Sequence, residues 1–179
     1  WQVDPTTGEV RKDIVSALQV MSPQNQTASP EATTKAYVSG VLDKKDTNVT
    51  SEDGYTMTLG FFDNLGYSYT AKFAVKPKTR ENSTADGQYH ITLTDIIDSK
   101  SESILGTTDA DKQQKIQAVF GNGYDIDFDA NEGTFVSIGG NKQTSQMLNL
   151  SALTTGYTTN GQNGQQNVTS NFQNIELDF

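Results

Sequence analysis

Apolar and polar residues alternate along several stretches of the chain, as they do in β-strands with one buried face. The clearest case comprises strands near 55–62 and 67–76, joined by the turn Asp63-Asn64-Leu65-Gly66. The phase of the alternation places Leu59 and Phe73 on the buried face. The turn requires a positive φ, which Gly66 adopts without steric cost. The pattern therefore predicts a long β-hairpin.

The same alternation predicts further strands. They lie at 35–42, 88–97, 124–128, 134–138 and from 175 to the end. Polar and turn-forming residues between them predict extended loops at 22–34, 43–54 and 77–87, and a linker at 156–169. An Asn131-Glu132-Gly133 turn is expected to join the strands at 124–128 and 134–138.

One segment has a helical pattern instead. In TTDADKQQKIQAVFGNG, Thr108 can cap a helix near 108–120, and Asp109 and Asp111 fall in its first turn. Ile116, Val119 and Phe120 share one face, and Gly121 is expected to end the helix in the left-handed conformation. The prediction is a mainly β protein with one short helix.

Composition and charge exclude several functional classes. The apolar share, counted with Gly and without Tyr, is about 39%, against roughly 45–50% in typical globular domains. The formal net charge is −9, and the chain lacks the basic patch that nucleic-acid binding needs. The basic residues of Lys76-Pro77-Lys78-Thr79-Arg80 are expected at solvated strand ends. No apolar run is long enough for a membrane helix.

The run Asp125-Ile-Asp127-Phe-Asp129-Ala-Asn131 has the spacing of the first half of a calcium-binding loop. It departs from that motif because Ala130 replaces the required Gly and Val136 stands where the bidentate Glu belongs. A strand with its aspartates on the solvated face gives the same spacing. We therefore expect no metal site here, and no cofactor.

Candidates for catalysis are few. The chain has one histidine, His90, and no cysteine, so disulfides and thiolate chemistry are excluded. His90 lies between Tyr89 and Ile91, which are in phase with the core, so it is expected on the solvent face. No nucleophile-elbow motif accompanies it, and no pair of carboxylates stands out as glycosidase-like. We expect no catalytic residues and no enzymatic activity.

Five Asn-x-Ser/Thr sequons occur in the chain, at Asn25, Asn48, Asn82, Asn149 and Asn167. Such sequons mark glycosylated surface loops in secreted eukaryotic proteins. In a chain this rich in Asn, Ser and Thr, composition explains them better.

The order of segments resembles the bacterial flagellar hook protein family. WQVDPTTGEV at 1–10, ATTKAYVSGVLDKKD at 32–46, the 55–75 hairpin, YDIDFDANEGTF at 124–135 and NFQNIELDF from 171 each resemble a landmark of that family, in the same order. Gly40-Val41-Leu42-Asp43 departs from the more frequent Gly-Asn-Leu-Asp. The stretch 99–123, with its helix, has no counterpart among these landmarks.

The resemblance implies two β-sandwich or barrel-like domains. An outer domain at 47–169 would be inserted into a discontinuous inner domain formed by 1–46 and 170–179. It further implies a structural subunit of a curved tube that transmits motor torque, outside the cell, after type III export. Its partners would be other hook subunits and the cap, rod and hook–filament junction proteins. The family's terminal core segments have no counterpart here, so the fragment itself is expected to be monomeric at low concentration.

Two other functions remain open. One is an extracellular carbohydrate-binding or adhesin domain, whose sign would be an exposed aromatic platform. Tyr67, Tyr69 and Tyr157 are the candidates, although the first two are in phase with Phe73 and are expected to be buried. The other is a hydrolase, which an acidic cleft would favour.

Overall fold

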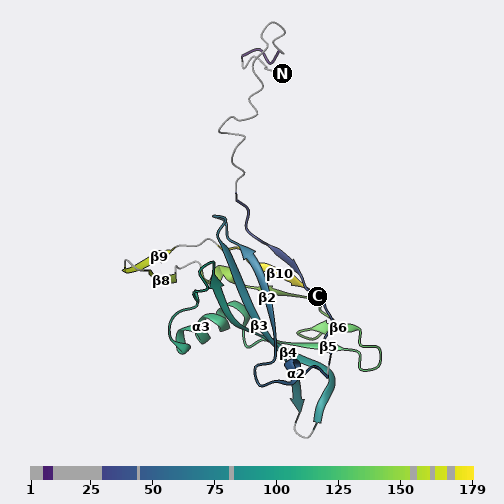
Figure 1. Ribbon diagram of the computed structural model, residues 1–179. Coiled ribbons are helices and arrows are strands. Elements are labelled where there is room, and N and C mark those ends of the chain that lie inside the picture. Colours follow the sequence, from purple (N-terminus) through teal and green to yellow (C-terminus); the bar gives the residue numbers. More distant parts are fainter. Residues whose placement is uncertain are drawn as a thin grey trace.

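The computed structural model describes residues 6–9, 30–43, 45–80, 83–153, 157–161, 164–168 and 172–179 (Figure 1). Most of the regular structure is β. Five antiparallel strands form the larger sheet, in the order β2 (Tyr55–Phe62), β3 (Ser68–Arg80), β4 (Ser83–Asp98), β5 (Tyr124–Phe128) and β6 (Phe135–Ile138). The expectation of a mainly β chain is confirmed.

A smaller sheet joins segments that are far apart in the sequence. Its order is β1 (Lys35–Tyr37), β10 (Ile175–Asp178) and β7 (Ser145–Leu148). β1 runs parallel to β10, and β7 runs antiparallel to it. A parallel pair needs a long connection between its strands, and here almost the whole described chain provides it. A further hairpin consists of β8 (Tyr157–Gly161) and β9 (Gly164–Val168).

The predicted hairpin is present. β2 and β3 pair in one continuous register from Tyr55↔Val75 to Phe62↔Ser68. Phe73 is 2% exposed and Leu59 is half-buried, as the alternation predicts, and Gly66 has a φ of +84°. The expectation that Tyr67 is buried is wrong, because this residue precedes β3 in the turn and is 59% exposed.

Two predicted loops are partly strand. The loop expected at 77–87 is wrong over much of its length, because β3 continues to Arg80 and β4 begins at Ser83. Pro77 is tolerated because, in the phase of the β2–β3 pairing, its nitrogen points away from β4, and β2 does not extend beyond Tyr55, opposite Val75. The linker expected at 156–169 contains β8 and β9, whose two-residue separation suits a hairpin. At the first boundary, a short helix α2 (Thr47–Thr50) follows the Asp46 cap.

The predicted helix is α3 (Asp109–Phe120), capped by Thr108, whose hydroxyl accepts from the Asp111 N–H. Its predicted buried residues all lie in the core. Gly121 has a positive φ of +64°, but its ψ of −148° is not left-handed helical, so that detail of the prediction is wrong. The helix packs against β4 and against the 3-10 helix η1 (Leu150–Leu153).

The two larger sheets share one apolar core. Phe120 of α3 meets Phe73 of β3 edge-on, with 5.4 Å between ring centroids. Phe172, just before β10, lies 4.9 Å from the Tyr69 ring and 6.0 Å from the Phe61 ring, again by centroids. Burial of these aromatic rings stabilises the hairpin and the last strand together. β7 lies within the range expected for the outer domain, yet it pairs with β10 of the range expected for the inner one.

Candidate functional site

Polar side chains gather on the face of the larger sheet opposite the core. Cross-strand register explains why: His90 on β4 pairs with Asp125 on β5, and Gln88 pairs with Asp127. Tyr89 and Ile91, which flank His90, are buried on the other face. The predicted side for His90 is therefore confirmed, although its side chain is 38% exposed rather than free in solvent.

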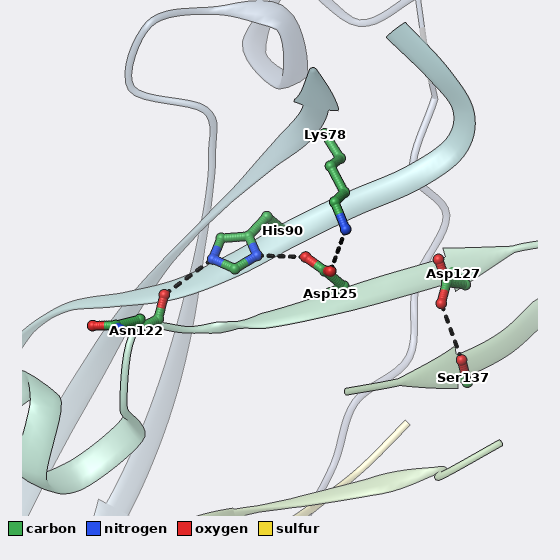
Figure 2. A network of polar contacts seen from close by, with 6 residues as sticks. All are labelled: Lys78, His90, Asn122, Asp125, Asp127 and Ser137. Atoms are coloured by element: carbon green, nitrogen blue, oxygen red, sulfur yellow. Dashed lines mark hydrogen bonds and ion pairs between the residues drawn. The ribbon is translucent and has the colours of Figure 1, made fainter. Parts of the chain in front are cut away.

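Asp125 is the centre of this network (Figure 2). Its Oδ1 lies 2.7 Å from His90 Nδ1, and its Oδ2 accepts from the ammonium of Lys78 on β3. These partners lower the pKa of Asp125 below its ordinary value; the Lys78 hydrogen bond has the largest effect, then the one from His90, while partial burial opposes them. Three neighbouring strands are thus linked through one ionised carboxylate.

The second ring nitrogen of His90 faces the backbone. Nε2 lies 3.0 Å from the carbonyl oxygen of Asn122, in the turn between α3 and β5. This turn approaches closely because residue 123 is glycine: a Cβ there would lie 2.3 Å from the Ile91 carbonyl oxygen and 2.8 Å from His90 Nε2. Both ring nitrogens face acceptors, so both contacts are hydrogen bonds at once only when the ring carries two protons.

The other residues of the acidic run have separate partners. Asp127 accepts a hydrogen bond of 3.2 Å from the Ser137 hydroxyl on β6, as Figure 2 shows. Asp129 lies beyond the strand and accepts 2.8 Å hydrogen bonds from the backbone N–H groups of Asn131 and Glu132. These two bonds lower the pKa of Asp129 below its ordinary value. The three aspartates of the run therefore bond to separate partners, two within the sheet and one in the turn.

Within the described residues, no group of three or more His, Cys, Asp or Glu side chains could hold a metal ion. Beside the network is an open depression of about 380 Å³, lined in part by Gln88, Gly139 and Gly140. The side-chain oxygen of Gln88 is buried there and has no hydrogen-bond partner among the described residues. A larger groove of about 710 Å³ lies between α3 and β4, and its lining has no charged side chain.

The contacts of the network are those of a structural link between β3, β4 and β5. His90 is paired with a carboxylate, as a general base would be, but its other nitrogen faces a backbone carbonyl instead of a hydroxyl or thiol. Lys78 was not predicted as part of a site, because it was expected at a solvated strand end. The usable signal was that Lys78, His90 and Asp125 all fall on polar positions of alternating strands, but only the register joins them.

Two of the three candidate platform tyrosines, Tyr67 and Tyr69, do not share an exposed surface. Tyr69 is 3% exposed and packs against Phe61 and Phe172, whereas Tyr67 is exposed at the hairpin tip. The side chain of Tyr157 lies outside what the structure describes. No described helix is long and apolar enough to cross a membrane. No protein-family model, curated protein or solved structure matches the chain.

Proposed function

We propose that the protein is a structural, non-enzymatic subunit of the bacterial flagellar hook. The observation that carries the proposal is the series of landmark segments that resemble the hook family in the same order along nearly the whole chain. In this role the subunit polymerises into a curved, flexible tube that transmits motor torque to the filament. Its location is extracellular, in the hook, after type III export.

The fold supports this proposal at four landmarks. The segment 55–75 forms most of the β2–β3 hairpin, and 124–135 covers β5, the following turn and the start of β6. The first strand landmark, 32–46, and the last, from 171, contain β1 and β10, which pair side by side. Landmarks that are far apart in the sequence thus meet in one sheet.

The domain assignment belongs to the same proposal. Residues 1–46 and 170–179 would form the inner domain, and 47–169 the outer one. The parallel pairing of β1 with β10 supports it. Because β7 of the outer range pairs with β10 and both ranges contribute to one apolar core, the proposed domains would pack closely. Neighbouring hook subunits would be the main partners, with the cap, rod and hook–filament junction proteins at the ends of the tube.

The direct test is to locate the protein in the cell. Antibodies against the purified chain, used for immunogold electron microscopy on flagellated cells of the source bacterium, should label the short curved segment between cell surface and filament. Serum adsorbed with the purified chain is the control. Deleting the gene should leave cells without hooks and non-motile. Uniform labelling of the cell surface, or normal hooks after deletion, would contradict the proposal.

One observation favours the carbohydrate-binding or adhesin alternative. Tyr67 is 59% exposed at the hairpin tip, where Phe62 and Leu65 are about half exposed. Exposed aromatic rings are a common platform for ligands. Glycan-array binding that is lost in Tyr67→Ala and kept in Tyr37→Ala, a matched exposed tyrosine on β1, would support this alternative.

A further inference from the structure

β2 is an edge strand, and most of its outward backbone groups have no partner among the described residues. In an antiparallel pair, alternate residues direct both backbone groups toward the partner or away from it. The Phe62 N–H and C=O point away from β3, because they bond the Thr33 hydroxyl and the Thr33 N–H. Thr56, Thr58 and Gly60 share that phase. Among the described residues, nothing bonds to their backbone groups from outside the sheet.

Edge strands in folded proteins are normally protected from pairing with other chains by short length, charged residues, proline or bulges. The other edges of the two larger sheets have such protection. β6 has four residues and adjoins a register shift, β7 has four residues, and β1 has three and includes Lys35. β2 has eight residues, a continuous register with β3 and no proline. It is therefore the least protected of these edges.

The side chains of β2 are uncharged, although the whole chain has a net charge of −9. Thr56 and Thr58 are exposed on one face of the strand. On the other face Met57 and Leu59 are half-buried, and Tyr55 is 40% exposed. A second strand laid against this edge would cover the apolar side chains further and meet no opposing charge.

We propose that β2 pairs antiparallel with β2 of a second copy of this chain, about a two-fold axis at Thr58. In that register Thr58 faces Thr58 of the other copy, and Thr56 faces Gly60. The outward backbone groups of these residues then exchange about six hydrogen bonds. Met57 faces Leu59 across the pair on the apolar face. The five-stranded sheets of the two copies then become one continuous sheet.

The strand's own symmetry indicates a second copy as the partner. Positions at equal distances from Thr58 match in character: Thr56 and Gly60 are small, Met57 and Leu59 are unbranched or γ-branched apolar residues, and Tyr55 and Phe61 are aromatic. A two-fold interface requires this self-complementarity. The contact is small compared with stable interfaces, so pairing is weak. The chain should be monomeric at low micromolar concentration and dimeric near millimolar concentration.

This inference does not depend on the flagellar proposal, because it concerns the edge of one sheet in the isolated chain. Sedimentation velocity from low micromolar to near-millimolar concentration measures the dimer directly. Amide hydrogen exchange, followed by NMR across the same range, locates the contact. The amides of Thr56, Thr58 and Gly60 should become protected as concentration rises. Those of Met57 and Leu59, which bond to β3, should be protected throughout.

Charge variants test the register. Thr58→Asp places two carboxylates opposite each other in the dimer, while in the monomer residue 58 faces Lys72 of β3. We expect its dimerisation to be at least about tenfold weaker, a change of about 1.4 kcal/mol. An equimolar mixture of Thr58→Asp and Thr58→Lys should restore dimers. Val136→Asp, which adds a charge to an exposed side chain on the β6 edge, is the matched control and should dimerise like the parent.

Three results would overturn the inference. The first is a chain that stays monomeric up to millimolar concentration. The second is a dimer that Thr58→Asp leaves unchanged, or that the mixture fails to restore, while circular dichroism shows folded variants. The third is full protection of the Thr56, Thr58 and Gly60 amides at low concentration, which would mean that another segment of the same chain covers the edge.

Discussion

Two turns of the larger sheet have the same hydrogen-bond geometry and different sequences. In the β2–β3 turn, Asp63 Oδ1 accepts 2.9 Å bonds from the N–H groups of Leu65 and Tyr67, and the Gly66 N–H donates to the Asp63 carbonyl at 3.0 Å. After β4, Asp98 Oδ1 likewise accepts 2.9 Å bonds from Lys100 and Glu102.

The second turn closes in the same way. The Ser101 N–H donates to the Asp98 carbonyl at 3.0 Å, and the Asp98 N–H bonds the Glu102 carbonyl at 2.9 Å, as Asp63 bonds Tyr67 at 3.1 Å. The fourth residue of each turn has a positive φ: +84° at Gly66 and +66° at Ser101.

The comparison separates two roles. The aspartate is common to both turns and satisfies their backbone donors, whereas glycine in the fourth position reduces the steric cost of positive φ but is not required. Burial also differs. Asp63 is fully buried and lies 3.4 Å from the Tyr69 hydroxyl, which donates to its second oxygen, while Asp98 is partly exposed. The turn at Asp63 is therefore expected to contribute more to the free energy of unfolding than the turn at Asp98.

The largest effect is expected from Asp63→Ala. Loss of this buried carboxylate leaves two partly buried N–H donors and the buried Tyr69 hydroxyl without this acceptor, so the free energy of unfolding should fall by about 3–5 kcal/mol. Urea denaturation measures the change. Lys100→Ala, at an exposed position of the other turn, is the control and should stay within about 0.5 kcal/mol of the parent. A loss below about 1 kcal/mol for Asp63→Ala would show that water replaces the carboxylate without cost.

Asp98→Ala should cost less, about 1–2 kcal/mol, because solvent can reach the freed donors at this partly exposed turn. The same denaturation experiment gives the value, and the ratio to Asp63→Ala measures what burial adds. If the two variants lost equal stability, burial would not explain the difference between the turns.

Gly66→Ala should destabilise by about 1 kcal/mol. An L-residue pays for the positive φ, and the new Cβ would lie 3.1 Å from Pro30 Cβ. Thermal unfolding by circular dichroism should show a lower midpoint. An unchanged midpoint would indicate that the turn relaxes to another conformation, which NMR of the Gly66 position can reveal.

The reverse substitution in the other turn, Ser101→Gly, should stabilise the protein by about 0.5 kcal/mol. Glycine relieves the strain of φ +66° but adds freedom to the unfolded chain, so the net gain is small. Ser99→Gly, at an exposed position two residues earlier, is the matched control and should not stabilise. A loss of stability in Ser101→Gly would refute the view that residue 101 is strained.

The smallest effect concerns a third turn, in which Asp129 accepts from two backbone N–H groups and Gly133 has a φ of +68°. The lowered pKa of Asp129 means that its ionised form is favoured in the folded state. The resulting stability is present above the unfolded pKa of about 3.9 and is lost as pH falls through the lower folded pKa. Carboxyl NMR titration should give the folded value, and Asp129→Asn should remove this part of the acid dependence. A pKa of Asp129 in the folded protein at its ordinary value would contradict this prediction.

The elements that were predicted correctly have a local signal in the sequence. The β2–β3 hairpin follows from period-two alternation and a glycine-containing turn, and α3 follows from the Thr108 cap and one apolar face. The turn at Asp98 was not predicted, because a serine at position 101 does not indicate a positive φ. β3 was predicted to end too early, because Pro77 and the polar residues after it resemble a loop and only the pairing with β4 holds them in a strand.

Local sequence patterns thus predicted the β-rich class, the Thr108 cap of α3 and the buried face of the strands they identified, because these features depend on residues close together in the sequence. Contacts between residues that are far apart in the sequence are set by the tertiary structure. The parallel pairing of β1 with β10, the contact of Phe172 with the hairpin and the joining of Lys78, His90 and Asp125 depend on strand order and register. A shift of one residue would move each side chain to the opposite face, and no local pattern specifies which strands are neighbours.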